Sequence, residues 1–353
     1  MAKYIFYKQK LIDNINMLKD AYRSKGINFK IYYSVKTNPS DCVLEIINNE
    51  NCNFEVVSYD EWLSVKKYNP TTLVLNGPSK DIKILKNIFD CNVKELYFNI
   101  DNDTDFDIID SIDNIYTDKL KLGVRVYLDK TGIWNRFGFD IDSPRLVQII
   151  KKYRDKINGF HFHFSTNNFN FENYLQIMTK INNLIDKYQL NLEYIDIGGG
   201  FPGASEEMYS NIIYNKLPDL IKTMMPDNIT IISEVGRNLI EDTFNMKTSV
   251  ISKKKISEDK FDIVIDTNIL HFPCYWEKKF GIDYIVKNAN KDQKPININI
   301  FGNSCMQIDK IADNFLIACE PNINDNVIIS KIGAYSVSQA SNFITKIPNI
   351  VIL

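Results

Sequence analysis

The residues best suited to chemistry in this chain of 353 residues stand at or near the ends of short apolar runs. Lys36 closes the run KIYYSVK, Glu55 lies in NFEVVS, and Glu234 follows TIIS. A lysine in a water-poor position has a lowered pKa, and its neutral amine can attack a carbonyl group. A buried carboxylate needs a partner, either a structural arginine or the protonated ring nitrogen of a bound molecule. These three residues therefore predict a site that combines an amine nucleophile with carboxylates.

Two histidines, His161 and His163, lie in the run GFHFHF and are separated by one residue. On a strand such residues point to the same side, so only one face would see both. Zinc is the alternative occupant of such a pair, but the chain has only three histidines, and neither HExxH nor CxxC accompanies them. We therefore expect no metal at this site.

The motif DIGGGFPG places Gly198, Gly199 and Gly200 directly after an apolar run. Glycines let the backbone approach an anion closely and expose N–H groups to it. Arg237, three residues after Glu234, would add a charged clamp. Taken singly, the glycines also suit a tight turn, and the Glu–Arg pair also suits a structural ion pair. Together they predict a phosphate site.

Eight apolar runs alternate with segments of helical period, which is the strand count of a (β/α)8 barrel. Several runs are apolar almost throughout, as parallel strands buried on both faces are. A doubly wound open sheet is the structural alternative. In a barrel the carboxyl ends of all strands meet at one mouth, and Arg125 on the fifth run would join the residues above. The eight runs are 28–36, 53–58, 72–77, 95–100, 121–127, 159–164, 194–200 and 230–236.

The sequence pattern changes after residue 243, where predicted strands follow one another with little helix between them. This pattern predicts an all-β domain. We therefore expect an α/β chain with two domains. Residues 8–242 form the (β/α)8 TIM barrel, residues 243–353 form the C-terminal β-domain, and residues 1–7 join the β-domain.

Composition excludes several classes of function. The net charge is −2 and no basic stripe is present, which argues against a nucleic-acid partner. No apolar run approaches the roughly 18 residues of a membrane span, and the N-terminus has no apolar signal region. Six scattered cysteines indicate reduced thiols, so we expect a cytoplasmic protein.

The series of motifs resembles that of the fold-type III pyridoxal-phosphate decarboxylases, the ornithine, diaminopimelate and carboxynorspermidine decarboxylase relatives of alanine racemase. The likeness spans nearly the whole chain, keeps the order of the motifs and favours the barrel. YYSVKTNP is similar to Y-A-V-K-A-N-P, which puts Lys36 at the lysine that carries pyridoxal 5'-phosphate (PLP). FEVVSYDEW resembles D-V-V-S-x-x-E, with Glu55 at the usual aspartate and Glu61 at the second acid.

Three further barrel motifs fit the resemblance. GFHFHFST resembles G-x-H-F-H-x-G-S, which makes His163 the ring stacked on the cofactor and puts Thr166 at the usual serine. DIGGGFPG matches the phosphate-binding turn, and SEVGR resembles E-P-G-R with Val235 in place of proline. The cofactor-binding set implied by the resemblance is Lys36, Glu55, Arg125, His163, Thr166, Gly198, Gly199, Gly200, Glu234, Gly236, Arg237 and Tyr335.

The resemblance also implies a head-to-tail homodimer with shared active sites. GNSCMQID resembles G-P-x-C-[DE]-x-x-D, so Cys305 would reach into the partner's barrel as a proton donor. GAYSVSQASNF puts Tyr335 near the cofactor phosphate. The implied catalytic residues are Lys36, His163 and Cys305, and the implied reaction is the decarboxylation of an amino acid, with PLP as the electron sink.

One departure from the pattern bears on the substrate. Family members that form diamines carry an acid directly after the cysteine, which binds the distal ammonium of the substrate, whereas this chain has Met306. We therefore expect a modified or conjugated diamino acid, as in siderophore or antibiotic assembly. The alternatives are free ornithine, lysine or diaminopimelate, a racemase on the same fold, and a non-catalytic regulatory homologue. The expected substrate-binding residues are Arg136, Asp266, His271, Met306 and Asp309.

Overall fold

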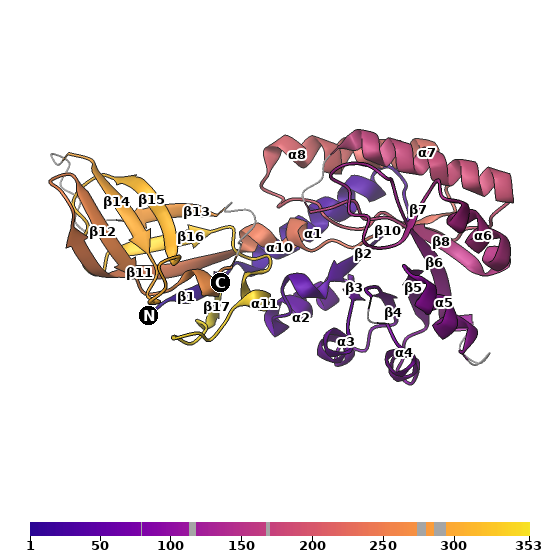
Figure 1. Ribbon diagram of the computed structural model, residues 1–353, viewed down its shortest axis with the longest axis horizontal. Helices are drawn as coiled ribbons and strands as arrows, with labels where there is room; N and C mark the ends of the chain where they lie inside the picture. The colour runs from indigo at the N-terminus through magenta and orange to yellow at the C-terminus, as the bar shows by residue number, and fades with distance from the viewer. Residues whose placement is uncertain (79, 113–117, 167–169, 274–279, 286–293) are drawn as a thin grey trace. The chain divides into compact units, whose positions relative to one another are not determined.

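The computed structural model describes residues 1–353 apart from 79, 113–117, 167–169, 274–279 and 286–293. The chain forms two compact units, one of residues 12–239 and one of residues 1–11 with 240–353 (Figure 1). Among the described residues, no helix has the length and apolar character needed to cross a membrane.

The unit of residues 12–239 is a closed barrel of eight parallel strands. Each strand pairs with its neighbours in the order β5-β4-β3-β2-β10-β9-β8-β6, and the pairing of β5 with β6 closes the ring. This confirms the barrel and excludes the open sheet. The strands are β2 (Phe29–Ser34), β3 (Asn53–Val56), β4 (Thr72–Leu75), β5 (Glu95–Ile100), β6 (Leu120–Tyr127), β8 (Ile157–His161), β9 (Tyr194–Asp196) and β10 (Thr230–Ser233). A short strand, β7 (Phe139–Asp140), extends the sheet beside β6.

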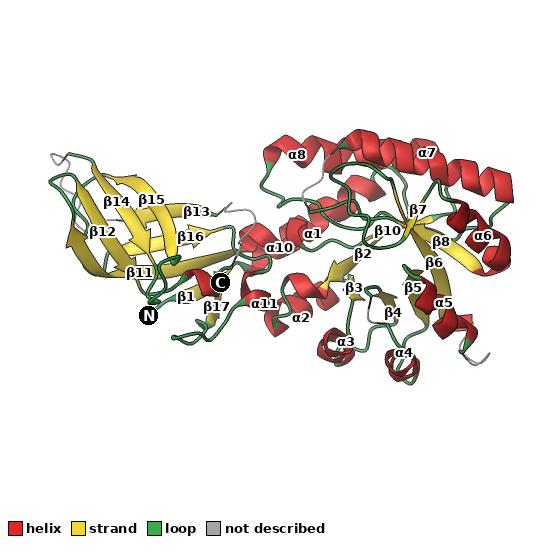
Figure 2. Cartoon of the chain, viewed as in Figure 1, coloured by secondary structure: helices red, strands yellow, loops and turns green. Residues whose placement is uncertain are grey.

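Helices follow most of the strands, as Figure 2 shows. Side-chain caps define where they begin: Asp81 accepts a hydrogen bond from the N–H of Ile84 at 2.8 Å, and Ser58 accepts one from Glu61 at 3.2 Å. Each such cap stabilises its helix by about 1 kcal/mol. The helices are α1 (Lys8–Arg23), α2 (Asp41–Asn49), α3 (Tyr59–Lys66), α4 (Ile82–Phe89), α5 (Asp103–Asp110), α6 (Pro144–Tyr153), α7 (Phe171–Tyr188), α8 (Glu207–Asn211), α9 (Leu217–Met224) and α10 (Arg237–Ile240).

Tyrosines take part in filling the core of the barrel below its mouth. Tyr194 is fully buried and packs edge-on against Tyr97, with ring centroids 4.8 Å apart. A Cβ at Gly159 would lie 2.5 Å from the ring of Tyr194, and one at Gly123 would lie 2.3 Å from its hydroxyl oxygen. Glycines on two adjacent strands, β6 and β8, therefore make the room that this tyrosine needs.

The second unit is built mainly from strands. Along β12 and the first half of β11, buried side chains alternate with half-buried or exposed ones, as in a sheet with one face on a core. The strands β11, β12, β13, β14, β15 and β16 pair in the order β13-β16-β11-β12-β14-β15, and β1 lies between β11 and β17. The elements are β1 (Lys3–Phe6), β11 (Phe244–Lys255), β12 (Lys260–Ile265), β13 (Gly281–Ile285), β14 (Ile296–Phe301), β15 (Lys310–Ile317), β16 (Asn326–Ser330), α11 (Ser336–Gln339) and β17 (Ile350–Ile352).

Candidate active site

Lys36 lies just past a strand end at the mouth of the barrel. Strand β2 ends at Ser34, and Lys36 occupies a single 3-10 turn, Val35–Thr37, where the sequence suggested the last position of a strand. Its Nζ lies 2.7 Å and 3.0 Å from the two carboxylate oxygens of Glu55. Glu55 is buried, whereas the side chain of Lys36 is 41% exposed. The pair thus neutralises a buried carboxylate and leaves the amine accessible.

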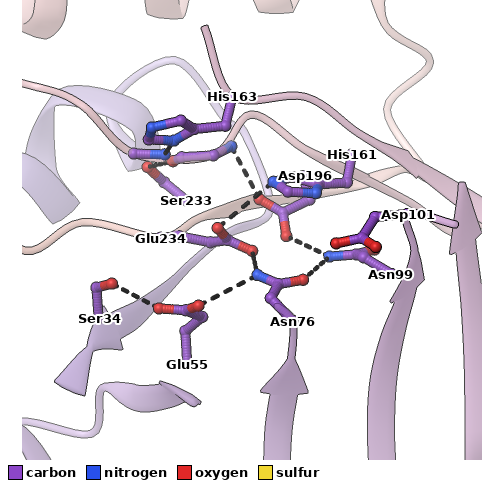
Figure 3. A network of polar contacts seen from close by, with 12 residues as sticks. Ser34, Glu55, Asn76, Asn99, Asp101, His161, His163, Asp196, Ser233 and Glu234 are labelled. Carbon is purple, nitrogen blue, oxygen red and sulfur yellow. Dashed lines mark hydrogen bonds and ion pairs between the residues drawn. The ribbon is translucent and has the colours of Figure 1, made fainter. Parts of the chain in front are cut away.

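Glu234 is the second carboxylate of the mouth and follows β10. Its Oε2 lies 3.4 Å from Nε2 of His161, and its Oε1 accepts a hydrogen bond from Asn76 (Figure 3). Burial alone would raise its pKa, but the contacts with His161 and neighbouring donors outweigh burial and hold the pKa of Glu234 well below its usual range. Burial, and then the charge of Glu234, raise the pKa of the neighbouring Asp196. Asp196 therefore carries the proton of this pair, and Glu234 carries the charge.

His163 is fixed by the glycine turn. The N–H of Gly199 donates to its Nδ1 at 3.1 Å, so the proton of the neutral ring lies on Nε2. Burial, and then the charge of Arg125, lower the pKa of His163 to about 3, which keeps the ring neutral. His163 lies two residues beyond the end of β8, whereas His161 ends the strand. The two histidines thus have different neighbours, the amide of Gly199 for His163 and the carboxylate of Glu234 for His161.

The glycines bring the turn onto the strand ends. Gly198 and Gly200 have φ values of +66° and +83°, which favour glycine. A Cβ at Gly199 would lie 2.3 Å from the carbonyl oxygen of Glu234, and one at Gly200 would lie 2.2 Å from that of Ser165. No side chain fits at these positions without moving the backbone.

These residues fit PLP. Within the described part of the chain, the amide N–H groups of Gly200 and Gly236 have no hydrogen-bond acceptor, so they are available to a phosphate. Lys36 offers an accessible amine for the aldehyde, and Glu234 offers an ionised carboxylate for a protonated ring nitrogen. The ring of His163 is neutral and can lie against an aromatic face.

Other predicted barrel residues take varied positions. Arg125 is buried, and its guanidinium lies 4.9 Å from the centre of the Phe137 ring. Arg136 is exposed and lies 5.0 Å from the same ring, so Phe137 contacts both arginines. Burial lowers the pKa of Arg125. Arg237 begins α10, directly after Gly236, and Thr166 is half-buried beyond β8.

The predicted residues of the second unit divide into exposed and structurally bonded groups. Cys305 is exposed and Met306 is half-buried, both in the turn between β14 and β15. Asp309 is buried, and its carboxylate accepts from the N–H of Ile269 at 2.9 Å and from the N–H and hydroxyl of Ser304 at 3.0 and 2.6 Å. Asp309 therefore fixes the turn that carries Cys305, and its contact with substrate stays a prediction.

His271 and Asp266 also have partners within this unit. His271 is buried, with Nδ1 3.0 Å from the hydroxyl of Thr267 and Nε2 3.4 Å from that of Thr345. Asp266 is 28% exposed and accepts from the N–H of Ala2 at 3.1 Å. Tyr335 is half-buried and adopts a left-handed backbone, with φ +62°, at the start of α11. Their contacts with substrate or cofactor stay predictions.

The polar network contains residues that sequence reasoning missed. Asn76 follows β4, and Asn99 and Asp196 lie at the ends of β5 and β9, among the same strand ends that identified Lys36 and Glu234. Their position at strand ends could have identified them. An uncharged amide at a strand end is less conspicuous in a sequence than a charged residue. Trp134 was also missed; its ring lies 5.5 Å from that of His163.

One cluster in this network has the residue types of a metal site. Ligand atoms of His161, Asp196 and Glu234 lie within 4.8 Å of one another and are buried. Hydrogen bonds already occupy the two carboxylates, since Asp196 accepts from Gly198 at 2.9 Å and from Asn99 at 3.1 Å, and Glu234 accepts from Asn76. A proton on Asp196 beside an ionised Glu234 is an alternative to a cation, and the absence of a metal stays a prediction.

Glu61 should make the stability of the protein depend on pH. Burial, and then the charge of Glu55, raise the pKa of Glu61 to about 7. The folded state therefore holds a proton that the unfolded chain releases above about pH 4.5, and the free energy of unfolding falls as pH rises toward 7. In Glu61→Gln we expect this loss to disappear, so the stability of the variant relative to wild type should rise by about 2 kcal/mol between about pH 5 and 8.

Urea denaturation at the two pH values measures this difference. Glu45→Gln, at an exposed position on α2, is the matched control. Its free energy of unfolding should change between the two pH values as much as that of the wild type. If the free energy of unfolding of Glu61→Gln changes with pH as that of the wild type does, Glu61 ionises normally in the folded protein.

Comparisons with known proteins agree with this geometry. Residues 9–241 match the family model described as "Pyridoxal-dependent decarboxylase, pyridoxal binding domain". A probable ornithine decarboxylase of Dictyostelium discoideum is 25% identical over 342 residues, which cover 90% of this chain and 72% of that protein. Antizyme inhibitor 1 of Mus musculus is 24% identical over 349 residues, which cover 89% and 74%.

A solved structure shows the same fold. The arginine decarboxylase of Paramecium bursaria Chlorella virus has a TM-score of 0.84 and 20% identity, and the match covers 100% of this chain and 95% of that one. The family model spans the whole barrel mouth, from Lys36 to Arg237. The chain therefore belongs to the pyridoxal-dependent decarboxylase family, and it is a PLP-dependent amino-acid decarboxylase of fold type III.

Proposed function

We propose that the enzyme removes the α-carboxylate of a modified or conjugated diamino acid in a biosynthetic pathway. The observation that carries this proposal is Met306, which stands directly after Cys305 in the turn between β14 and β15. A distal ammonium next to a thioether lacks a charge partner, which is costly in a desolvated pocket. A distal group that is capped, acylated or conjugated carries no such charge at that end.

The residues of the barrel mouth have distinct roles in this reaction. When bound, PLP supplies an electron sink that accepts the electron pair left by carbon dioxide. Lys36 would supply the amine that holds the cofactor, and Glu234 would supply a negative charge for its ring nitrogen. His163 would place a neutral ring against the cofactor face, and the glycine turn with Arg237 would receive the phosphate. Fixing the phosphate and the ring orients the bond to be broken.

Cys305 is the proposed proton donor to the reacting carbon after carbon dioxide leaves. It is exposed in its own subunit, as a residue that reaches into a partner's site must be. We propose a head-to-tail homodimer in which each site combines the barrel of one subunit with Cys305 of the other. Such a site would be completed only on association.

Complementation tests the shared site. Lys36→Ala and Cys305→Ala should each lose activity. When the two variants are mixed and allowed to exchange subunits, half of the dimers carry one intact site, so activity should return to about a quarter of the wild-type level. Activity that stays absent after demonstrated subunit exchange would contradict sites shared in this way.

Substrate choice should respond to position 306. We expect Met306→Asp to raise kcat/KM for free ornithine or lysine about tenfold to hundredfold, because a carboxylate then pairs with the distal ammonium. Met306→Leu keeps an apolar side chain without the charge and should leave the substrate preference unchanged. Carbon dioxide release from free, acylated and citryl-conjugated diamino acids measures the preference. Faster turnover of free ornithine, lysine or diaminopimelate by the wild type would refute our interpretation of Met306.

The alternative functions rest on the relatives. A free diamino acid is favoured by the name of the ornithine decarboxylase relative, and a non-catalytic regulator by that of the antizyme inhibitor. The ion pair of Lys36 with Glu55 and the glycine turn are both in place, which supports an enzyme. A protein that cannot bind PLP or release carbon dioxide from any member of the panel would support the regulator.

A further inference from the structure

One amide serves both carboxylates of the barrel mouth. Asn76 is buried, and its Nδ2 donates to Oε1 of Glu55 at 3.3 Å and to Oε1 of Glu234 (Figure 3). An amide NH2 group has two hydrogens, so each carboxylate receives one. Glu55 pairs with Lys36, and Glu234 pairs with His161, so Asn76 joins two halves of the site that have different partners.

A hydrogen bond from Asn99 sets the orientation of the Asn76 amide. Oδ1 of Asn76 accepts from Nδ2 of Asn99 at 3.0 Å, which leaves only the NH2 group of Asn76 to face the carboxylates. Asn99 is oriented in turn because its Oδ1 accepts from the hydroxyl of Tyr194 at 3.0 Å, and its Nδ2 also donates to Asp196 at 3.1 Å. A chain of donors therefore runs from Tyr194 through two amides to Glu55 and Glu234.

The NH2 group of Asn76 matters because it lies between two carboxylates. The carboxylates of Glu55 and Glu234 are buried side chains that contact the same nitrogen, and two carboxylates so placed repel each other when no donor lies between them. The side chain of Lys36 is partly exposed, and its amine must also bind the cofactor, so it is a changing partner for Glu55. The amide of Asn76 is held in place by Asn99 and is a fixed partner. The other charged or titratable groups that act on this pair are Arg125, His161, Asp196 and Glu61.

We propose that Asn76 is a positioning residue whose NH2 group holds the carboxylates of Glu55 and Glu234 side by side. Glu55 is thereby kept beside the Lys36 amine, and Glu234 is kept aligned for the ring nitrogen of PLP. The inference does not depend on which amino acid is decarboxylated.

Asn76→Asp tests the positioning role with little change in side-chain shape. It replaces the NH2 donor with a third carboxylate beside Glu55 and Glu234. The first readout uses the full-length protein without cofactor, labelled with ¹³C at the glutamate side-chain carboxyls. In the variant, a buried glutamate signal should titrate at least about one pH unit higher than in the wild type. The second readout is the dissociation constant of PLP, which should rise about tenfold to hundredfold.

Tyr194→Phe is the second variant. It removes only the hydroxyl that orients Asn99, and it should weaken PLP binding in the same direction by a smaller factor. Asn182→Asp is the matched control, because its amide donates to the carbonyl of Met224 at 2.9 Å in another part of the unit. It should leave both readouts unchanged.

The outcomes separate this inference from the broader assignment. A wild-type protein that fails to bind PLP would count against the cofactor, and the glutamate titration, which is measured without PLP, would still decide the role of Asn76. Unchanged glutamate titration and PLP affinity in a folded Asn76→Asp overturn the positioning role. If Asn76→Asp does not fold, Tyr194→Phe decides, and PLP affinity equal to that of the wild type overturns the proposal.

Discussion

Lys36→Ala is expected to lose at least about a thousandfold in kcat/KM and to lose the visible absorbance of bound PLP. The variant lacks the amine that holds the cofactor, and it also leaves Glu55 buried without the cation that lies 2.7 Å away. The loss should therefore appear in both binding and turnover. Absorbance of the dialysed protein and release of carbon dioxide measure the two effects.

Lys36→Arg provides the control for charge. A guanidinium can keep the ion pair with Glu55, but it stays protonated and cannot hold the aldehyde. We expect this variant to fold like the wild type and to be inactive. Borohydride reduction of the wild-type protein in the presence of PLP should attach the pyridoxyl group to the peptide that contains Lys36. Attachment to another lysine would overturn the assignment.

Glu234→Gln is expected to lower kcat about a hundredfold, the usual scale for removing a preorganised electrostatic group. Glutamine keeps the shape of the side chain but removes the charge that His161 and Asn76 stabilise. A neutral partner does not hold the ring nitrogen protonated, and the electron sink becomes shallower. Binding of PLP should weaken less than kcat falls, because the phosphate contacts are untouched.

Steady-state kinetics together with PLP titration separate these two effects. Glu193→Gln, at an exposed pair with Lys121 away from the mouth, is the control and should leave both quantities unchanged. Equal kcat in Glu234→Gln and wild type would mean that the ring nitrogen does not rely on this carboxylate.

The barrel and much of its mouth could be predicted because chemistry and position coincide there. Charged residues at the ends of apolar runs are costly unless they have a purpose, and Lys36, Glu55 and Glu234 stand out for that reason. Local geometry was less predictable. Lys36 lies in a 3-10 turn past its strand, because β2 already ends at Ser34.

Residues whose role comes from tertiary hydrogen bonds could not be recognised in the same way. Asn76 and Asn99 carry no charge, and only the closed barrel shows that their amides contact Glu234 and Asp196. The reverse holds for His271 and Asp309, whose types suggested substrate contact. Both have buried hydrogen-bonded roles that depend on segments far apart in sequence, His271 with Thr345 and Asp309 with Ile269.

The pairing of β1 has a consequence for the order in which the protein forms during synthesis. Tyr4 lies opposite Met246 in β11 and opposite Ile350 in β17, so its partners leave the ribosome after the whole of residues 12–239. The barrel, whose contacts are more local, can fold while residues 3–6 wait unpaired. A chain stalled before residue 350 could thus hold a folded barrel while β1 still lacks its β17 neighbour, and such an open strand edge is prone to aggregate.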